Sequence, residues 1–282
     1  MLSYQHGYHA GNFADLLKHV TLTRLLTYLT QKEKPLFYLD THAGRGLYDL
    51  NDQQALKTGE AQVGIELLWN QRAHLSPVFL PYLNTILKKN GTTSSLKPDQ
   101  VLRYYPGSPA LALELLRPQD RLWFNELHPT EYNALELLPR LGKHVTMSPE
   151  DGLTALHALL PPPERRGLIF IDPSYEIKSD YRTIPEAVHA AYKRFSTGVY
   201  CVWYPILDRK VHGQLTRRFE QIEASNPLCI EFYKSKTLGE DLQGTGLWIL
   251  NAPYVLQAEL IEVMNQLKKI IHPGRSFYLV NP

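Results

Sequence analysis

An acid, a proline and an aromatic residue follow directly on an apolar run in "LIFIDPSY". The Asp172 carboxylate and the Pro173 carbonyl are hydrogen-bond acceptors, and the proline ring fixes the backbone direction between them. Two such acceptors can hold both hydrogens of an aromatic exocyclic amine, so that its lone pair points at an electrophile. Tyr175 can stack on the base that carries the amine. The stretch predicts group transfer to a nucleobase amine, with Asp172, Pro173 and Tyr175 as catalytic residues.

Three other apolar runs also end in acids. Asp40 leads into "THAGRG", where Gly44 lets the backbone approach a ligand closely. Glu126 ends "LWFNE", a position where an acid commonly binds a ribose diol, although a solvated acid would give the same pattern. Asp151 precedes a glycine, which suits a hydrogen bond to an adenine amine but also makes an ordinary turn. Together these positions predict a nucleoside cofactor. The glycine spacing of nicotinamide-binding folds and the Gly-Lys-Ser/Thr of a phosphate-binding loop are both missing.

The pattern of elements explains how these acids come together. From residue 36 onward short apolar runs alternate with amphipathic stretches, which predicts a doubly wound, mostly parallel α/β sheet. Ligands of such sheets lie beyond the carboxyl ends of the strands, so the acids are expected at one edge. A helix is predicted from Asn12, a good N-cap, to about Gln31. Residues 47–100 are polar and helix-prone, and they end in "NGTTSSLKPDQ", which has a loop composition.

We therefore expect one domain with an insertion. Residues 1–46 form an N-terminal tail, a helix and the first strand, residues 47–100 an inserted helical subdomain, and residues 101–282 the rest of the domain. The chain of 282 residues is 44% hydrophobic, enough for a large core, and its net charge of +2 indicates no general polyanion binder. With only Cys201 and Cys229, no disulfide framework is expected. A polar N-terminus and the lack of a long apolar run predict a cytoplasmic protein away from membranes, and no feature points to an oligomer.

Several residues have two readings. His6, His9, His19 and His42 suggest either a metal site or a polar cofactor pocket and RNA contact. Neither cysteines nor a His-Glu-x-x-His motif accompany them, so we favour the second interpretation and expect no metal. The basic pairs 193–194 and 217–218 suit either an RNA-facing patch or a solvated helix face. The Trp-Tyr-Pro at 203–205 either frames a base pocket or packs in the core.

Six stretches together resemble one family. They are "LSYQHGYHAGNFADLLKH", "YLDTHAGRGLYDL", "LRYYPGSP", "NELHP", "RRGLIFIDPSYE" and "YKRFSTGVYCVWYP". They are similar to the RlmJ family of bacterial enzymes that methylate an adenine N6 in 23S ribosomal RNA, and the similarity runs from Leu2 to near the C-terminus. It implies a Rossmann-like class I methyltransferase with a seven-stranded sheet. It also implies S-adenosyl-L-methionine as cofactor and ribosomal RNA as the partner, with the target base flipped into the Asp-Pro-Ser-Tyr pocket.

The resemblance also implies roles for individual residues. Asp172 accepts from the target amine, and Tyr4, together with Tyr175, contacts the RNA. Ser174 stands where the family motif usually has a second proline. Because a proline also restricts the residue before it, the serine is expected to loosen the loop that carries Tyr175, and we expect activity to survive. The residues implied around the cofactor are His19, His42, Gly44, Ser108, Glu126, Asp151, Gly152 and Asp172.

Two other functions stay open at this point. The first is a nucleic-acid-binding or processing protein that transfers no methyl group and serves the use of external DNA. The second is N6-adenine methylation of DNA, although an insertion of about 50 residues is small for a target-reading domain. Methylation of a protein glutamine is less favoured, because such enzymes typically have Asn in place of Asp172.

Overall fold

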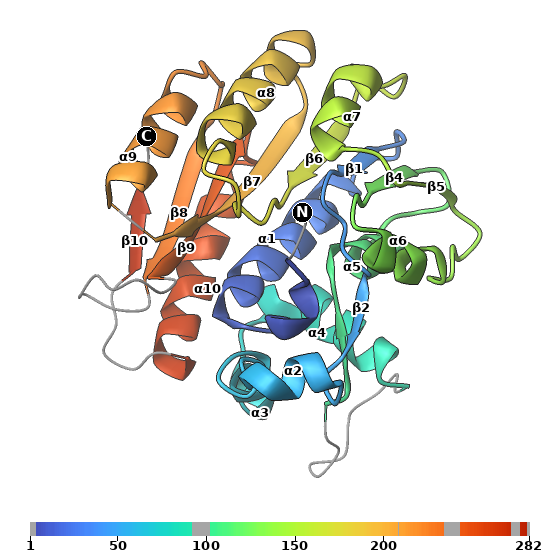
Figure 1. The fold of residues 1–282 in the computed structure, drawn as a ribbon, viewed down its shortest axis with the longest axis vertical. Helices are drawn as coiled ribbons and strands as arrows, with labels where there is room; N and C mark the ends of the chain where they lie inside the picture. The colour runs from blue at the N-terminus through green and yellow to red at the C-terminus, as the bar shows by residue number, and fades with distance from the viewer. Residues whose placement is uncertain (1–3, 92–101, 208, 234–242, 272–276, 281–282) are drawn as a thin grey trace.

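The centre of the protein is one eight-stranded sheet, in the order β10-β8-β9-β7-β6-β1-β4-β5 (Figure 1). The computed structural model describes residues 4–91, 102–207, 209–233, 243–271 and 277–280. The strands β5, β4, β1, β6 and β7 are parallel, while β9 runs antiparallel between β7 and β8, and β10 pairs antiparallel with β8. The strands are β1 Phe37–Asp40, β4 Arg121–Asn125, β5 His144–Ser148, β6 Gly167–Ile171, β7 Val199–Ile206, β8 Leu228–Tyr233, β9 Gly244–Leu250 and β10 Phe277–Val280. The predicted α/β fold is confirmed, and β10 is an eighth strand beyond the seven expected.

The register of the central strands brings the acidic residues to one edge. Asp40 on β1 lies opposite Phe124 of β4 and Phe170 of β6. Glu126 and Asp172 each follow two residues after those partners, so both emerge at the same level. The strands β1 and β6 are buried throughout, as expected for central parallel strands covered on both faces.

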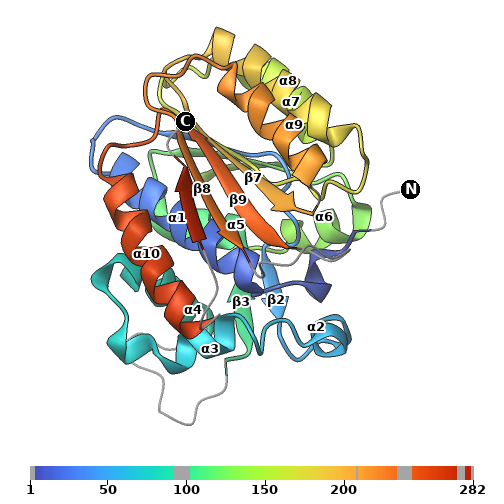
Figure 2. The ribbon, with the colours of Figure 1, turned by 90° about the vertical axis from the view of Figure 1, so that its left-hand side faces the viewer.

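Helices cover both faces of the sheet (Figures 1 and 2). One face carries α7 (Gly152–Leu159), α8 (Asp180–Arg194) and α9 (Arg209–Glu220), and the other carries α1 (Phe13–Leu29), α5 (Ser108–Leu115) and α10 (Leu256–Ile270). The helix α6 (Pro129–Glu136) lies near β5. Each face buries its own apolar cluster against the sheet.

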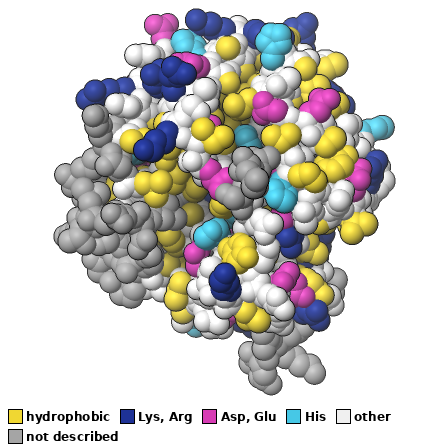
Figure 3. Space-filling model, viewed as in Figure 1, with side chains coloured by type: hydrophobic (Ala, Val, Ile, Leu, Met, Phe, Trp, Pro, Cys, Tyr) yellow, Lys and Arg dark blue, Asp and Glu magenta, His cyan; other side chains and the backbone are white. Residues whose placement is uncertain are grey.

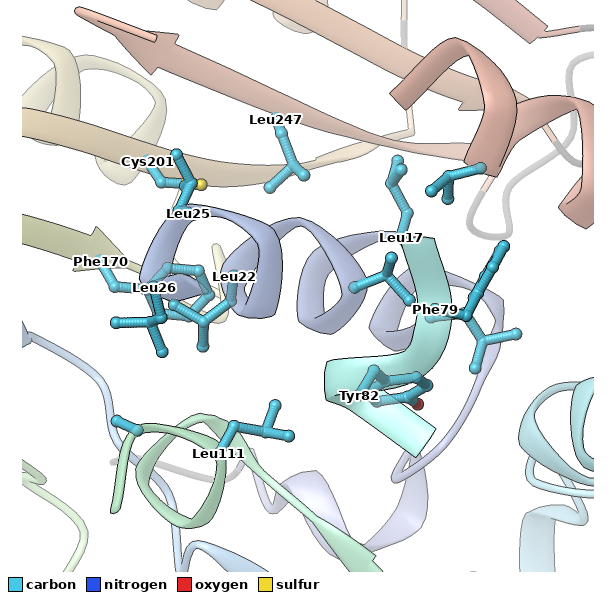
Figure 4. Packing of buried hydrophobic residues seen from close by; sticks show 14 of the residues in the cluster. Leu17, Leu22, Leu25, Leu26, Phe79, Tyr82, Leu111, Phe170, Cys201 and Leu247 are labelled. Atoms are coloured by element: carbon cyan, nitrogen blue, oxygen red, sulfur yellow. The ribbon is translucent and has the colours of Figure 1, made fainter. Parts of the chain in front are cut away.

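The first helix lies in the middle of the larger cluster. Asn12 caps it as predicted, since its side-chain oxygen accepts from the amides of Ala14 and Asp15, and it ends two residues before the predicted limit. Leucines point from it toward the sheet, α5 and α4, as Figure 4 shows for Leu17, Leu25 and Leu26. A helix this buried has little room for charge, which makes its few charged residues informative.

The inserted segment packs against this helix. Its helices are α2 (Gln53–Thr58), α3 (Ile65–Asn70) and α4 (Leu80–Lys89), and Phe79 and Tyr82 belong to the same apolar cluster as α1 (Figure 4). The sequence did not predict β2 (Leu47–Asp49) or β3 (Tyr104–Pro106), which pair antiparallel where the segment leaves and rejoins the domain. Almost all of the expected loop "NGTTSSLKPDQ" lies outside the described residues, and the division into three segments stays a prediction.

Candidate active site

A cavity of about 820 Å³ opens where the central strands end, large enough for a nucleoside cofactor beside a base. Histidine and acidic side chains gather around the middle of this face of the molecule (Figure 3). The cavity brings together most of the residues that the sequence singled out. Those among its lining are Tyr4, His19, His42, Gly44, Ser108, Glu126, Asp151, Gly152, Asp172 and Pro173.

Backbone amides fix the orientation of Glu126. One carboxylate oxygen accepts from the amide of Gly44 and the other from the amide of His128, both at 2.7 Å. Burial raises the pKa of Glu126 even though these two amides oppose the shift. Each oxygen keeps a lone pair, so the carboxylate can still accept from two vicinal hydroxyls.

Asp151 and Gly152 form the start of α7. The Asp151 carboxylate caps the helix by accepting from the amide of Leu153 at 3.0 Å. At Gly152 the chain passes so close to β1 that a Cβ atom would lie 1.9 Å from the carbonyl oxygen of Thr41. The glycine is therefore required by packing, and it lets the Asp151 turn lie directly beside the β1 turn.

Two buried groups near Glu126 and Asp151 have pKa values that differ from their ordinary values. Burial lowers the pKa of His42 to about 4, so its ring, with Nδ1 2.8 Å from the Thr41 hydroxyl, is neutral at pH 7. Burial raises the pKa of Asp40 to about 7. Asp40 is completely buried, accepts a hydrogen bond from Tyr38 at 3.0 Å, and is not part of the cavity lining, so it lies beneath the site.

On the other side of the cavity, Asp172 is held by a chain of side chains from the N-terminus. Its Oδ2 lies 2.6 Å from Nζ of Lys18, which also lies 2.9 Å from Oδ1 of Asp15. His6 bonds Asp15 at 2.9 Å and Tyr4 at 2.8 Å. Two carboxylates thus share one ammonium, and burial raises the pKa of Asp172 although Lys18 opposes it.

Sequence reasoning missed Asp15 and Lys18, and it placed His6 in a polar cofactor pocket or in RNA contact without predicting its bond to Asp15. The signal was present, because Asp15 and Lys18 are charged residues one turn apart on a helix that is buried along most of its length. Fully buried charges are rare unless they are paired. Such a pair inside a buried helix predicts a partner elsewhere, although not which one.

The structure does not bring Tyr175 to the cavity. Its φ of 53° turns the side chain back under the loop, where its ring lies 4.7 Å from that of Tyr181 and 6.1 Å from that of Trp203. The stacking surface expected from Tyr175 is therefore absent in this conformation. Trp203 and Pro205 line the cavity instead, and Nζ of Lys18 lies 5.2 Å above the Trp203 ring.

Comparison with known proteins decides the family. Residues 33–280 match the model of a family described as "Ribosomal RNA large subunit methyltransferase D, RlmJ". Two proteins named "Ribosomal RNA large subunit methyltransferase J" are 41% identical (Haemophilus influenzae) and 38% identical (Escherichia coli), each over 97% of this chain and 95% of the relative. The chain belongs to the RlmJ family. The crystal structure of protein LPL1258 from Legionella pneumophila matches with a TM-score of 0.90 and 48% identity over 97% of this chain and 98% of that one.

These matches confirm the family predicted from the sequence, and with the observed sheet they confirm the methyltransferase fold class. They also support S-adenosylmethionine as the cofactor. The residues fit this cofactor, since an oriented carboxylate suits its ribose and an acid-glycine turn suits its adenine. Among the described residues no group of three or more His, Cys, Asp or Glu lies so as to hold a metal ion. In the same part of the chain no helix is long and apolar enough to cross a membrane.

Proposed function

We propose that this RlmJ-family protein transfers the methyl group of S-adenosylmethionine to N6 of an adenine in 23S ribosomal RNA. The observation that supports this proposal most directly is that Asp172, which is paired with Lys18, lines the same cavity as the acids Glu126 and Asp151. The names of the relatives from Haemophilus influenzae and Escherichia coli support large-subunit ribosomal RNA as the substrate. Such a substrate is found in the cytoplasm, where we expect the protein to act as a monomer.

The half of the cavity lined by Glu126 and Asp151, the cofactor half, binds and orients the cofactor. Glu126 accepts from the ribose hydroxyls, Asp151 and Gly152 meet the adenine, and Gly44, Ser108 and the histidines 19 and 42 complete the lining. S-adenosylmethionine, when bound, supplies a methyl group on a positively charged sulfur. The protein's part is to place that group in line with the target nitrogen, because orientation accounts for much of the rate of such transfers.

In the other half of the cavity, the target half around Asp172 and Lys18, Asp172 orients the N6 amine of the target adenine. Lys18 occupies Oδ2, and no described residue donates a hydrogen bond to Oδ1, so this oxygen and the Pro173 carbonyl are available for the two N6 hydrogens. When the cofactor is bound, N6 would take the methyl group and with it a positive charge. The Asp172 carboxylate is placed to stabilise that charge and would accept the excess proton from N6.

The adenine must leave its stack to reach this position. Tyr4 and Trp203 line the cavity beside Asp172 and offer aromatic surfaces for the flipped base. The ring of Tyr4 is itself stacked on His9, at 5.7 Å and 9° between planes, so the N-terminal tail forms part of the base pocket.

The test is incubation of the full chain with methyl-labelled S-adenosylmethionine and a 23S ribosomal RNA transcript, followed by nuclease digestion and chromatography of the nucleosides. We expect the label in N6-methyladenosine, and Asp172→Asn should abolish it. Label found only with DNA of the same sequence would favour the DNA enzyme. Absence of both label and cofactor binding in the folded wild type would favour the non-methylating alternative.

A further inference from the structure

A buried line of polar side chains connects the insertion to the cavity. His19 lines the cavity from α1, and its Nδ1 lies 2.7 Å from the hydroxyl of Tyr105 on β3. The hydroxyl of Tyr82 on α4 lies 3.0 Å from the same Tyr105 oxygen. Both tyrosines are completely buried, and Figure 4 shows Tyr82 on the side of α1 away from the sheet. Such polar groups in an apolar core are costly unless every hydrogen has an acceptor.

Counting the hydrogens fixes the direction of this line. Tyr105 has a single hydroxyl hydrogen and therefore donates either to Tyr82 or to His19. If it donated to Tyr82, the Tyr82 hydrogen would have no acceptor among the described residues, at a site without solvent. Tyr82 therefore donates to Tyr105, and Tyr105 donates to Nδ1 of His19.

The protonation states agree with this direction. Burial raises the pKa of Tyr82 and of Tyr105 well above the ordinary value, so both phenols keep their hydrogens. Burial lowers the pKa of His19 to about 3, so the ring carries one proton at pH 7. Because Nδ1 accepts from Tyr105, that proton sits on Nε2, the nitrogen left for a ligand.

We infer that Tyr82 and Tyr105 are positioning residues that hold His19 as the Nε2–H tautomer, so that it donates to the carboxylate of the cofactor's amino-acid part. This inference rests on the proposed function. With the ribose at Glu126 and the adenine at Asp151, we place the amino-acid part against the remaining wall of the cavity, to which α1 contributes Asp15, Lys18 and His19. The cavity is lined there by carboxylates, and a ligand carboxylate needs a donor that is not already paired, whereas Lys18 is shared by Asp15 and Asp172.

The same line gives the inserted segment a role in cofactor binding without any contact to the cofactor. Tyr82 lies within the segment, and Tyr105 lies on the strand by which the chain leaves it. Correct packing of α4 against α1 then decides which nitrogen of His19 carries the proton.

The test compares Tyr105→Phe with wild type by calorimetry, using S-adenosylhomocysteine and 5′-methylthioadenosine, which lacks the amino-acid part. We expect Tyr105→Phe to bind S-adenosylhomocysteine about tenfold more weakly than wild type, because one oriented hydrogen bond to a charged group is lost. Its affinity for 5′-methylthioadenosine should stay within about twofold of the wild-type value. Tyr82→Phe removes only the outer donor and should show a smaller loss. Tyr200→Phe is the matched control, because its buried hydroxyl bonds the carbonyls of Ala191 and Phe195, on the far face of the sheet.

A spectroscopic measurement separates positioning from mere packing. Nitrogen-detected NMR of the ligand-free protein, with His19 assigned by its loss in His19→Gln, should show Nδ1 without and Nε2 with a proton, and a tautomer mixture in Tyr105→Phe. Equal weakening of both ligands, or a protonated Nδ1 in wild type, would overturn the inference. Wild type that shows the Nε2–H tautomer but binds neither ligand would instead overturn the proposed function, and with it the assignment of the donor to a cofactor.

Discussion

The two halves of the cavity hold their acids in different ways. In the cofactor half, Glu126 and Asp151 are oriented by backbone amides that lie within a few residues of them or in the adjacent strand turn. In the target half, Asp172 is held by Lys18, more than 150 residues earlier in the chain, and Lys18 in turn by Asp15. The first arrangement follows from local turns, and the second depends on how α1 packs under the sheet. The halves should therefore respond differently to substitution.

The largest expected effect is on the rate of methyl transfer. Asp172→Asn keeps the shape of the side chain but removes the charge that stabilises the developing ammonium. We expect methyl transfer to fall by about 10³-fold, within the range for loss of a charged catalytic group. Single-turnover rates with labelled cofactor measure this. A variant that retains more than a tenth of the wild-type rate would remove Asp172 from the mechanism.

The buried charges in the target half predict a large effect on stability. Lys18→Met leaves Asp15 and Asp172 buried without their shared cation, and we expect a loss of about 3–5 kcal/mol in the free energy of unfolding. Arg24→Met is the matched control on the same helix, since its ion pair with Glu259 is partly exposed, and it should cost at most about 1 kcal/mol. Urea unfolding compares the two variants. Equal losses would show that the Lys18 network is ordinary surface electrostatics.

The backbone of the cofactor half can be disturbed without changing any charge. In Gly152→Ala the new Cβ meets the Thr41 carbonyl, so the Asp151 turn must move away from the β1 turn. We expect S-adenosylhomocysteine to bind at least about tenfold more weakly, on the order of 1.4 kcal/mol. Gly213→Ala, where a Cβ meets nothing within 4 Å, serves as control and should leave binding unchanged. Unchanged binding in Gly152→Ala would show that this close approach does not shape the site.

The smallest expected effect is a pH dependence at the tail. The hydrogen bond that the His9 ring donates to Glu60 raises the pKa of His9 above 6.5. Burial raises the pKa of Glu60, but the hydrogen bonds from His9 and Asn12 outweigh it and lower that pKa below 4.5. The His9 contribution is complete below pH 6.5 and is lost as pH rises through the raised value. The Glu60 contribution is complete above pH 4.5 and is lost as pH falls through the lowered value. The contact should thus be strongest between these two pH values.

An NMR titration of the His9 ring in Glu60→Gln checks this. The substitution should bring the pKa of His9 back toward its ordinary value of 6.5. If the midpoint stays where it is in wild type, Glu60 does not hold the tail. Glu66→Gln is the control, because Glu66 lies in the same inserted segment but His9 pairs with Glu60, and it should leave the pKa of His9 unchanged.

The contrast between the halves also explains what the sequence could predict. The strand ends, the Asn12 cap and the acid-glycine turns were predicted because each depends on residues that are neighbours in the chain. The pairing of Lys18 with Asp172 and the line from Tyr82 to His19 were not, because they join elements whose packing no local pattern specifies. The position of Tyr175 was not specified by a local pattern either, because its φ of 53° is left-handed, and its ring lies outside the cavity lining in this conformation.

The most direct test of the account is calorimetric titration of S-adenosylhomocysteine into wild type, Glu126→Gln and Asp172→Asn. We predict micromolar binding by wild type, at least about tenfold weaker binding by Glu126→Gln, and binding within about threefold of wild type by Asp172→Asn. That result would establish a cofactor half anchored at Glu126 and separable from the catalytic acid. Lack of binding by folded wild type, or equal losses in both variants, would contradict it.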